Sequence, residues 1–372
     1  LLASAIPSDS LAIRDAVAAL PTSPWRDPAL ALLITGFGLK MGLVPLHVWL
    51  PIAHPAAPMP ASAVLSGAII KAGVIGLIRF LPFDVPLPDW GIALTAMGLF
   101  TAFYSVAIGI TQPNPKTVLA YSSVSQMGVV ATVLGMGLAA GQSSAVMAAT
   151  FYSAHHLLTK GALFLAVGVV AATGSRRLWW VLTPAAILAL GVGGLPLTGG
   201  ALAKLAIKPV LGDGWVELLA TLSAIGTTLL MLHFLHRLAA SASPDGSAAA
   251  PVGLALPWML MFIAALVVPW MLYSVAGMDS GYDALQLGIL WAALWPLLIG
   301  AGLALGLWRW GRYLPQAPEG DIVVVGQPAM RVVVRCEEVL ERVEGVLRQW
   351  PVAGLSLLML ILVLGGVIFN GH

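Results

Sequence analysis

Four lysines lie inside long hydrophobic segments of this chain, and their chemistry is more informative than that of any other residues. Lys71 is the clearest case, because the remaining residues of its bilayer-length segment, 61–80, are almost all apolar or small. A charge in such a segment is costly, so it is usually retained for a proton or ion pathway. Lys40, Lys160 and Lys204 repeat the pattern. Removal from water makes the neutral amine accessible, so these lysines are predicted proton relays.

Histidine accompanies lysine in one of these segments. His156 precedes Lys160 by four residues, which places both on one face of a helix. An imidazole and an amine on one face can pass a proton through water. His156 is therefore predicted to belong to the same relay.

Four further residues are weaker candidates for relay or for proton uptake and release. For the two histidines that bracket residues 48–53, helix capping or packing is an equal alternative. For the lysine near the end of its segment, the alternative is an amine that reaches the membrane surface. This second group is His47, His54, His155 and Lys208.

The composition indicates an integral membrane protein. Hydrophobic residues make up 59% of the 372 residues, charged residues make up 9%, and the mean hydropathy is +0.94. Only helices and closed barrels satisfy the backbone in lipid, and the segments here are helix-length without strand alternation. The predicted fold is all-α and polytopic. The net charge of +2 does not favour nucleic acid as a partner, and one cysteine, Cys336, excludes an internal disulfide or a cysteine-bound metal cluster.

Ten transmembrane helices are predicted, and the first and the sixth are interrupted by Gly and Pro. Interruptions at membrane depth are tolerated where neighbouring helices or water satisfy the freed backbone groups, as in transporters. They indicate a polar path inside the bundle. The predicted spans are residues 29–50, 58–81, 90–111, 117–139, 144–172, 178–211, 213–237, 252–275, 284–308 and 350–369.

Charges in alternate loops predict the orientation. Lys and Arg gather on one side and Asp on the other, so the positive-inside rule places the Lys/Arg-rich loops in the cytoplasm and both termini outside. Residues 319–349 have apolar positions at three- and four-residue spacing, which favours a cytoplasmic amphipathic helix, with a solvated connector as the alternative. The predicted regions are an outer segment 1–28, an ion-translocating bundle 29–212, further helices 213–318, this amphipathic helix, and a final span within 350–372.

The chain resembles the antiporter-like membrane subunits of respiratory complex I, energy-converting hydrogenases, formate hydrogenlyase and Mrp-type Na⁺/H⁺ antiporters. The resemblance extends over about residues 30–210 and rests on motifs in a fixed order. They are GLKMGLVPLHVWLPIAHPAAP at 38–58, SGAIIKAG at 66–73, NPK at 114–116 with AYSSVSQMG at 120–128, HLLTKGALFL at 156–165, and the stretch from Gly194-Leu-Pro to Lys204.

The resemblance implies a proton-translocating subunit. Lys40 matches the lysine of the first broken helix, which the family normally pairs with a glutamate two helices earlier, and Lys71 matches the central relay lysine. His156 and Lys160 match the next relay pair, and Lys204 matches the terminal lysine of the second broken helix. The glutamate-bearing helix would precede Leu1, so another chain or segment is expected to supply it. Ala203-Lys204-Leu-Ala also departs from the Ser-Lys-Asp or Ser-Lys-Glu that the family often has.

The leading functional hypothesis is a proton-translocating subunit of a redox-driven complex in a bacterial or archaeal cytoplasmic membrane. No catalytic residue, cofactor site or metal site is predicted in this chain. Flavin, iron–sulfur or nickel–iron centres are expected in peripheral partner subunits, beside further membrane subunits. One alternative is a subunit of a secondary Na⁺/H⁺ antiporter or of an ion-coupled solute carrier, for example for inorganic carbon. The other is a membrane anchor that does not pump.

Overall fold

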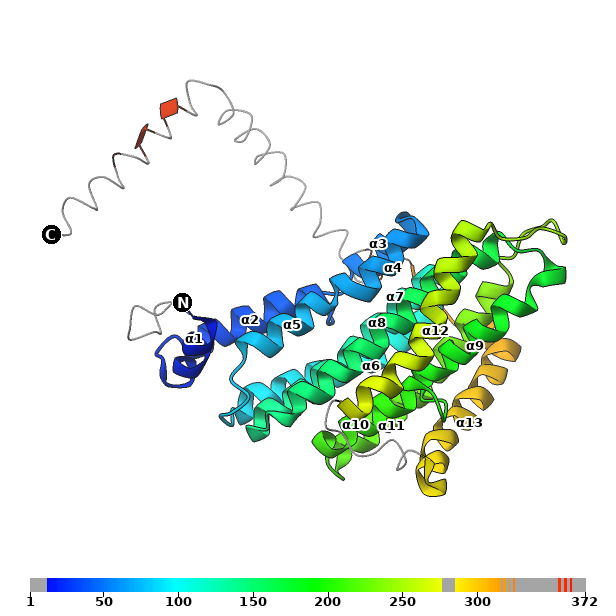
Figure 1. Cartoon of the computed structure of the whole chain (residues 1–372). Coiled ribbons are helices and arrows are strands. Elements are labelled where there is room, and N and C mark those ends of the chain that lie inside the picture. Colours follow the sequence, from blue (N-terminus) through cyan, green and yellow to red (C-terminus); the bar gives the residue numbers. More distant parts are fainter. Residues whose placement is uncertain are drawn as a thin grey trace. The chain divides into compact units, whose positions relative to one another are not determined.

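The computed structural model describes residues 12–275 and 285–315, together with a few positions beyond them. The described part is helical, and apart from one isolated bridge between Gly174 and Ser243 it contains no β-structure. The predicted all-α fold is confirmed. Residues 1–320 form one compact unit, which is the part described below (Figure 1). The further described positions are 317, 318, 321, 324, 354, 355, 358, 359 and 362.

Seven helical stretches of the described chain are long and apolar enough to cross a membrane. The first, Met59–Phe80, consists of α4 (Met59–Val64), the π-helical segment η3 (Leu65–Ile69) and α5 (Lys71–Phe80). The others are α6 (Pro88–Gly109), α7 (Pro115–Ala140), α8 (Ser144–Ala171), α11 (Trp215–Ala239), α12 (Val252–Val275) and α13 (Leu287–Trp310). The shorter helices are α1 (Ile13–Ala19), η2 (Leu20–Thr22), α2 (Arg26–Met41), α3 (Trp49–Ala56), η4 (Ser175–Arg177), α9 (Trp179–Gly193), α10 (Gly199–Leu211) and η6 (Gly311–Tyr313).

Both predicted helix interruptions are present. The first span divides into α2 and α3, because Gly42 adopts a left-handed conformation with φ 80° and ends α2. Residues 42–48 are not helical, so the second half of the span is α3, which ends at Ala56 instead of at the predicted residue 50. The sixth span divides into α9 and α10, with Gly194 at φ 103° after the last turn of α9. Each break leaves backbone carbonyls without partners in their own helix.

A third interruption, η3, was not predicted. The π-helical segment Leu65–Ile69 widens the helix directly before Lys71. Such segments shift the register of the backbone hydrogen bonds and are frequent at functional sites. Here the shift frees a carbonyl beside a lysine.

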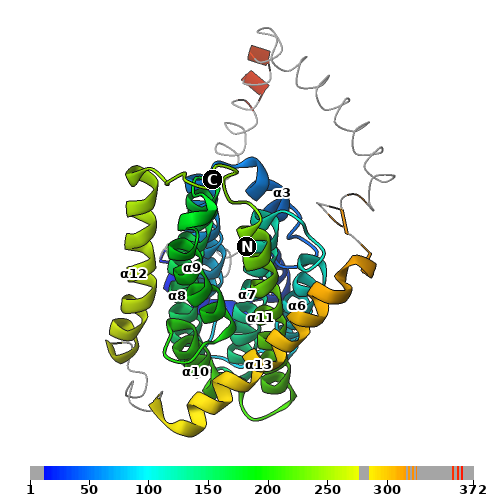
Figure 2. The same cartoon turned by 90° about the vertical axis from the view of Figure 1, so that its right-hand side faces the viewer.

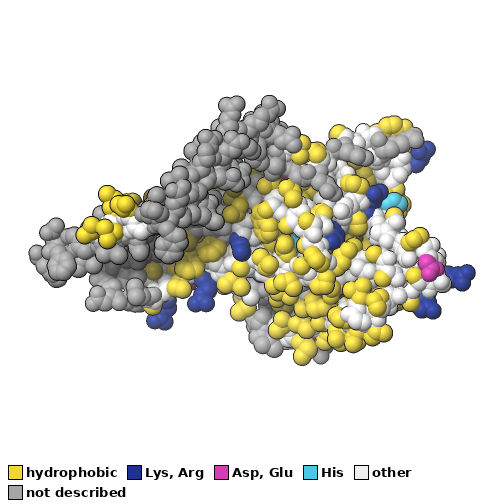
Figure 3. Space-filling model, turned by 90° about the horizontal axis from the view of Figure 1, so that it is seen from above, with side chains coloured by type: hydrophobic (Ala, Val, Ile, Leu, Met, Phe, Trp, Pro, Cys, Tyr) yellow, Lys and Arg dark blue, Asp and Glu magenta, His cyan; other side chains and the backbone are white. Residues whose placement is uncertain are grey.

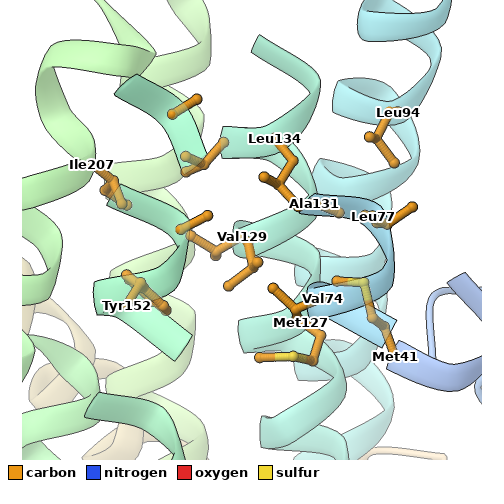
Figure 4. Packing of buried hydrophobic residues seen from close by; sticks show 14 of the residues in the cluster. Met41, Val74, Leu77, Leu94, Met127, Val129, Ala131, Leu134, Tyr152 and Ile207 are labelled. Atoms are coloured by element: carbon orange, nitrogen blue, oxygen red, sulfur yellow. The ribbon is translucent and has the colours of Figure 1, made fainter. Parts of the chain in front are cut away.

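Helices α7 and α8 form the centre of the bundle. In the most apolar window of each, 83% and 72% of the residues are buried, against 17% in α12 and 22% in α13. Their apolar side chains pack against α5 and α6 on one side and α10 on the other, as Val74, Met127, Val129, Tyr152 and Ile207 show in Figure 4. A helix buried on all sides needs apolar or small residues all round, as α7 has.

The periphery is consistent with a lipid-facing surface. Helix α12 lies at one edge of the bundle (Figure 2), and the described side chains on the face seen in Figure 3 are mainly hydrophobic, with few Lys and Arg. Trp291, Leu305 and Trp310 of α13 are among the exposed large apolar residues. In water such a surface would be unfavourable, so the structure supports an integral membrane protein.

Two loops join at one end of the bundle. The segment after α8 and the segment after α11 exchange backbone hydrogen bonds, from Gly174 N to Ala248 O (3.0 Å), Arg176 N to Gly246 O (3.2 Å) and Ser243 N to Thr173 O (3.1 Å). At this end the connections of α8–α9 and α11–α12 are therefore fastened to each other.

The C-terminal predictions lie outside the described residues. The amphipathic helix at 319–349 and the last span at 350–369 fall almost entirely on positions that the structure does not describe. The sidedness of the loops stays a prediction.

The start of α7 offers a test of the fold. Oδ1 of Asn114 accepts a hydrogen bond of 3.0 Å from the backbone N–H of Lys116 and caps the helix. Replacing Asn114 with Ala should lower the free energy of unfolding by about 1 kcal/mol, because a helix donor loses its partner. The melting temperature of the detergent-solubilised protein measures this, and Asn114→Asp, which keeps the acceptor, should melt like the wild type. An unchanged melting temperature for Asn114→Ala would contradict the cap.

Candidate functional site

Lys71 and His156 meet in the middle of the bundle. Lys71 Nζ lies 2.5 Å from Nδ1 of His156 on α8 and donates a second hydrogen bond of 2.8 Å to the carbonyl oxygen of Ser66. That carbonyl belongs to the π-helical segment. Both side chains are almost fully buried, with exposed fractions of 5% and 1%. The contact supports a direct proton exchange between amine and imidazole.

Lys160 lies one turn further along α8 and is fully buried. Its position shares a face with His156, as the spacing indicates, but its amine bonds to α7. Lys160 Nζ donates to the carbonyl oxygen of Leu119 at 3.3 Å and to Oγ of Ser122. Ser122 was not predicted from the sequence. The hydroxyl can both accept and donate, so it extends the polar path between α8 and α7.

Lys204 is held at the break between α9 and α10. Its amine donates to the carbonyl oxygen of Gly193, the last residue of α9. The negative end of a helix dipole stabilises a cation there. A side chain at Gly194 would place its Cβ 2.9 Å from Cδ and Nζ of Lys204, so the glycine makes room for the lysine.

His155 lies between the centre of the bundle and this break. Its ring is so close to the start of α10 that a Cβ at Gly199 would lie 2.7 Å from Nδ1 and one at Gly200 would lie 3.2 Å from Nε2. The charges of both Lys204 and Lys71 act on the ring. Nε2 is buried and makes no hydrogen bond to any described residue. His155 therefore lies within electrostatic range of both lysines.

His54 and Lys116 continue the line on the other side. His54 is fully buried, stacks on Phe164 of α8 at a centroid distance of 4.3 Å, and lies within electrostatic range of Lys160 and Lys116. Neither of its ring nitrogens bonds to a described residue, which is unusual for a buried polar side chain. Lys116 Nζ donates to the carbonyl oxygen of Ala57 at 2.6 Å, just past the end of α3.

The remaining predicted residues are not part of this line. His47 is buried with its ring against Tyr104 and Tyr121, at centroid distances of 5.4 and 6.2 Å, as the packing interpretation has it. Lys40 is exposed in the last turn of α2, and Lys208 is exposed near the end of α10. The structure thus brings five of the nine candidate residues together in the interior, and His54 adjoins them. These five are Lys71, His155, His156, Lys160 and Lys204.

Two absences hold for the described part of the chain. Its ion pairs, Arg14–Asp15 and Arg26–Asp27, are at the surface, so none of the interior lysines there pairs with a carboxylate. In the same part no three His, Cys, Asp or Glu side chains converge to hold a metal ion. The interior lysines bond to neutral acceptors instead.

A cavity of about 370 Å³ adjoins Lys204, and the sequence did not predict its polar lining. Tyr152 Oη donates to Oε1 of Gln126 (2.6 Å), and Nε2 of Gln126 donates to Oγ1 of Thr227 (3.1 Å). Glu217, in the first turn of α11, also lines the cavity. A signal existed for Glu217, since it is a lone carboxylate at the start of a hydrophobic helix, but nothing in the sequence placed it opposite Lys204.

Comparison with known proteins supplies the family. Residues 12–231 match the model of the family described as NADH:quinone oxidoreductase/Mrp antiporter, transmembrane. The matched part is more than half of the chain and contains every residue of the internal line. This chain belongs to that family.

The curated relatives within the NADH:quinone oxidoreductase/Mrp antiporter family come from several kinds of complex. Hydrogenase-4 component B of Escherichia coli K12 is 37% identical over 164 residues, which cover 41% of this chain and 24% of that protein. One of the Na⁺/H⁺ antiporter subunits of Alkalihalophilus pseudofirmus is 37% identical over 161 residues, which cover 40% and 20%. The chain therefore spans about a quarter or less of the length of these relatives.

A solved structure of the same fold confirms the architecture. The chain superposes on a chain of the membrane-bound sulfane sulfur reductase, an archaeal respiratory membrane complex, with a TM-score of 0.61 and 20% identity. The superposition covers 96% of this chain and 72% of the other. At this identity the likeness establishes the fold alone.

The room that Gly194 leaves for Lys204 can be tested with a matched pair of substitutions. Gly194 and Gly42 both end a helix at positive φ, 103° and 80°, so an alanine at either should cost about 1 kcal/mol of backbone strain. At Gly42 a Cβ has only ordinary contacts of 3.5 Å or more, whereas at Gly194 it displaces the lysine. We expect similar melting temperatures for Gly194→Ala and Gly42→Ala, but slower proton transport for Gly194→Ala. Equal transport in the two variants would contradict the placement of Lys204.

Proposed function

We propose that this chain is the proton-translocating part of a membrane subunit. Protons pass from Lys160 to His156 and Lys71, then through His155 to Lys204. The observation that carries the proposal is the 2.5 Å contact between Lys71 Nζ and His156 Nδ1 in a buried site without a carboxylate partner among the described residues. An ion-paired lysine would hold its proton, whereas an amine bonded to an imidazole and a carbonyl can exchange it.

Proton uptake is assigned to His54 and Lys116. Lys116 has an exposed fraction of 8% and lies in the first turn of α7, at the end of the bundle predicted to be cytoplasmic. His54 lies in electrostatic range of this lysine and of Lys160, with both ring nitrogens unpartnered among the described residues. A histidine in this position can accept a proton on one nitrogen and give up the other.

The driving reaction is proposed to be a redox reaction in partner subunits that carry flavin, iron–sulfur or nickel–iron centres. The support is the likeness to hydrogenase-4 component B and to a respiratory membrane complex. The remaining membrane partners would include the chain or segment that covers Lys40 and supplies the glutamate expected beside it. A bacterial or archaeal cytoplasmic membrane, with the Lys/Arg-rich loops inside, fits this assignment.

Membership of a secondary Na⁺/H⁺ antiporter is the second candidate. The specific observation in its favour is the 37% identity to the antiporter protein of Alkalihalophilus pseudofirmus. An ion-coupled solute carrier would use the same internal line. The redox-driven complex, the secondary antiporter and the ion-coupled carrier would share the lysine relay and differ in the chains that accompany it.

The relay is tested by replacing two basic residues of α5, Lys71 and Arg79, in turn. Lys71→Ala should abolish proton translocation, by a factor of about 10² or more, because a proton donor and acceptor is lost. Arg79→Ala is the control, since Arg79 is exposed at the end of the same helix. Both variants should assemble normally. The measurement is acidification of proteoliposomes that contain the intact complex. Lys160→Ala should behave like Lys71→Ala, and normal pumping by both lysine variants would refute the relay.

The uptake role of His54 is separable from its packing. His54→Phe keeps an aromatic ring to stack on Phe164 but removes both nitrogens. We expect an unchanged melting temperature and proton transport at least about tenfold slower, in the range that positioned proton carriers contribute. Transport at the wild-type rate would show that the ring only packs.

Mass spectrometry of the complex purified in mild detergent distinguishes the candidates for the driving reaction. Subunits with flavin, iron–sulfur or nickel–iron motifs are the expected result. A complex of membrane subunits alone would replace the redox assignment with a secondary antiporter or ion-coupled carrier.

A further inference from the structure

The cavity beside Lys204 is large enough to hold a chain of water. Its volume of about 370 Å³ corresponds to about twelve waters at their share of liquid volume. It is enclosed by α10 and α11 with residues of α7, α8 and α13. Polar groups line it at several levels, so water in it would find the partners that a buried water needs.

One face of α11 sets the direction of the cavity. Its wall includes four residues of α11 at helical spacing: Glu217, Thr221, Ala224 and Thr227. The distance from Glu217 to Thr227 along the helix axis is about 15 Å. Thr227 is almost fully buried, with an exposed fraction of 2%, whereas Glu217 is half-buried. Lys208, on the opposite wall, is exposed. The cavity therefore leads from the buried polar side chains toward the end of the bundle where α10 ends and α11 begins.

Glu217 supplies the negative charge that the internal line lacks. Of the described residues that line the cavity, it is the one carboxylate, and Lys204 and Lys208 line the same cavity from α10. It forms no ion pair with either lysine in the described structure, so it stays available as an acceptor. Thr221 donates a long hydrogen bond of 3.4 Å to Oε1, and the start of α11 stabilises a negative charge.

We propose that this cavity is the proton-release path and that Glu217 is the last proton acceptor before bulk water. The N–H bond of the Lys204 ammonium breaks as its proton enters the cavity water, and an O–H bond forms on the Glu217 carboxylate. Loss of that proton to the extracytoplasmic water regenerates the carboxylate. The inference rests on the proposed function, which brings the proton to Lys204, and on the predicted sidedness.

The carboxylate is tested by substitution in the intact complex. Glu217→Gln should slow proton translocation by about 10²-fold, as expected for loss of a positioned acid–base group, and should make the remaining rate depend on the outer pH. Glu217→Asp should retain most of the activity. Asp213→Asn is the matched control, because Asp213 is an exposed carboxylate just before α11 that does not line the cavity. Wild-type rates in Glu217→Gln would overturn the assignment.

Water access is tested by cysteine labelling, with transport as a second readout. The sequence has one cysteine, so Cys336→Ser gives a background for single cysteines. Thr221→Cys and Ser223→Cys should react with a membrane-impermeant cationic thiol reagent added from outside, and the reaction should block transport. No labelling, or labelling from the cytoplasmic side alone, would overturn the release path. If the proposed lysine relay itself were wrong, the Lys71→Ala complex would pump normally, whether or not the cysteines are labelled. The two failures are therefore distinguishable.

Discussion

The structure depends on buried ammonium groups that bond to backbone carbonyls rather than to carboxylates. An isolated amine inside a bilayer needs polar partners, and a regular helix offers few because its carbonyls are already used within the helix. For three of the lysines a helix end or interruption supplies the carbonyl, whereas Lys160 bonds to Leu119 O and Ser122 Oγ inside α7. The π-helical segment leaves Ser66 O for Lys71, the end of α9 leaves Gly193 O for Lys204, and the end of α3 leaves Ala57 O for Lys116. These three lysines therefore depend on helix ends and interruptions for their hydrogen-bond acceptors.

Neutral partners have an electrostatic consequence. A carbonyl stabilises an ammonium group but does not cancel its charge, so the charge acts on the next site along the line. Two unit charges about 4 Å apart in a partly buried setting interact by about 4 kcal/mol. Lys160 acts on Lys71 and His156, and Lys71 and Lys204 act on His155. A charge on one site therefore disfavours a charge on its neighbour.

Much of the fold and part of the site could be predicted from the sequence. Hydropathy was sufficient for the long spans, and Gly42 and Gly194 marked both helix breaks because left-handed backbone favours glycine. The spacing of His156 and Lys160 placed them on one face, yet it could not show that Lys160 turns to α7, since that choice is made by the packing of another helix. The sequence did not predict Ser122, Gln126 or Glu217 as site residues for the same reason. Their placement depends on side chains of other helices. Lys40 is exposed in this chain, although its mid-segment position resembled that of the buried lysines.

The bonded loops after α8 and α11 fasten four helices to one another at one end of the bundle. Three backbone hydrogen bonds join the α8–α9 connection to the α11–α12 connection. Because these bonds run from main chain to main chain, a displacement of α8 or α9 at this end is passed directly to α11 and α12.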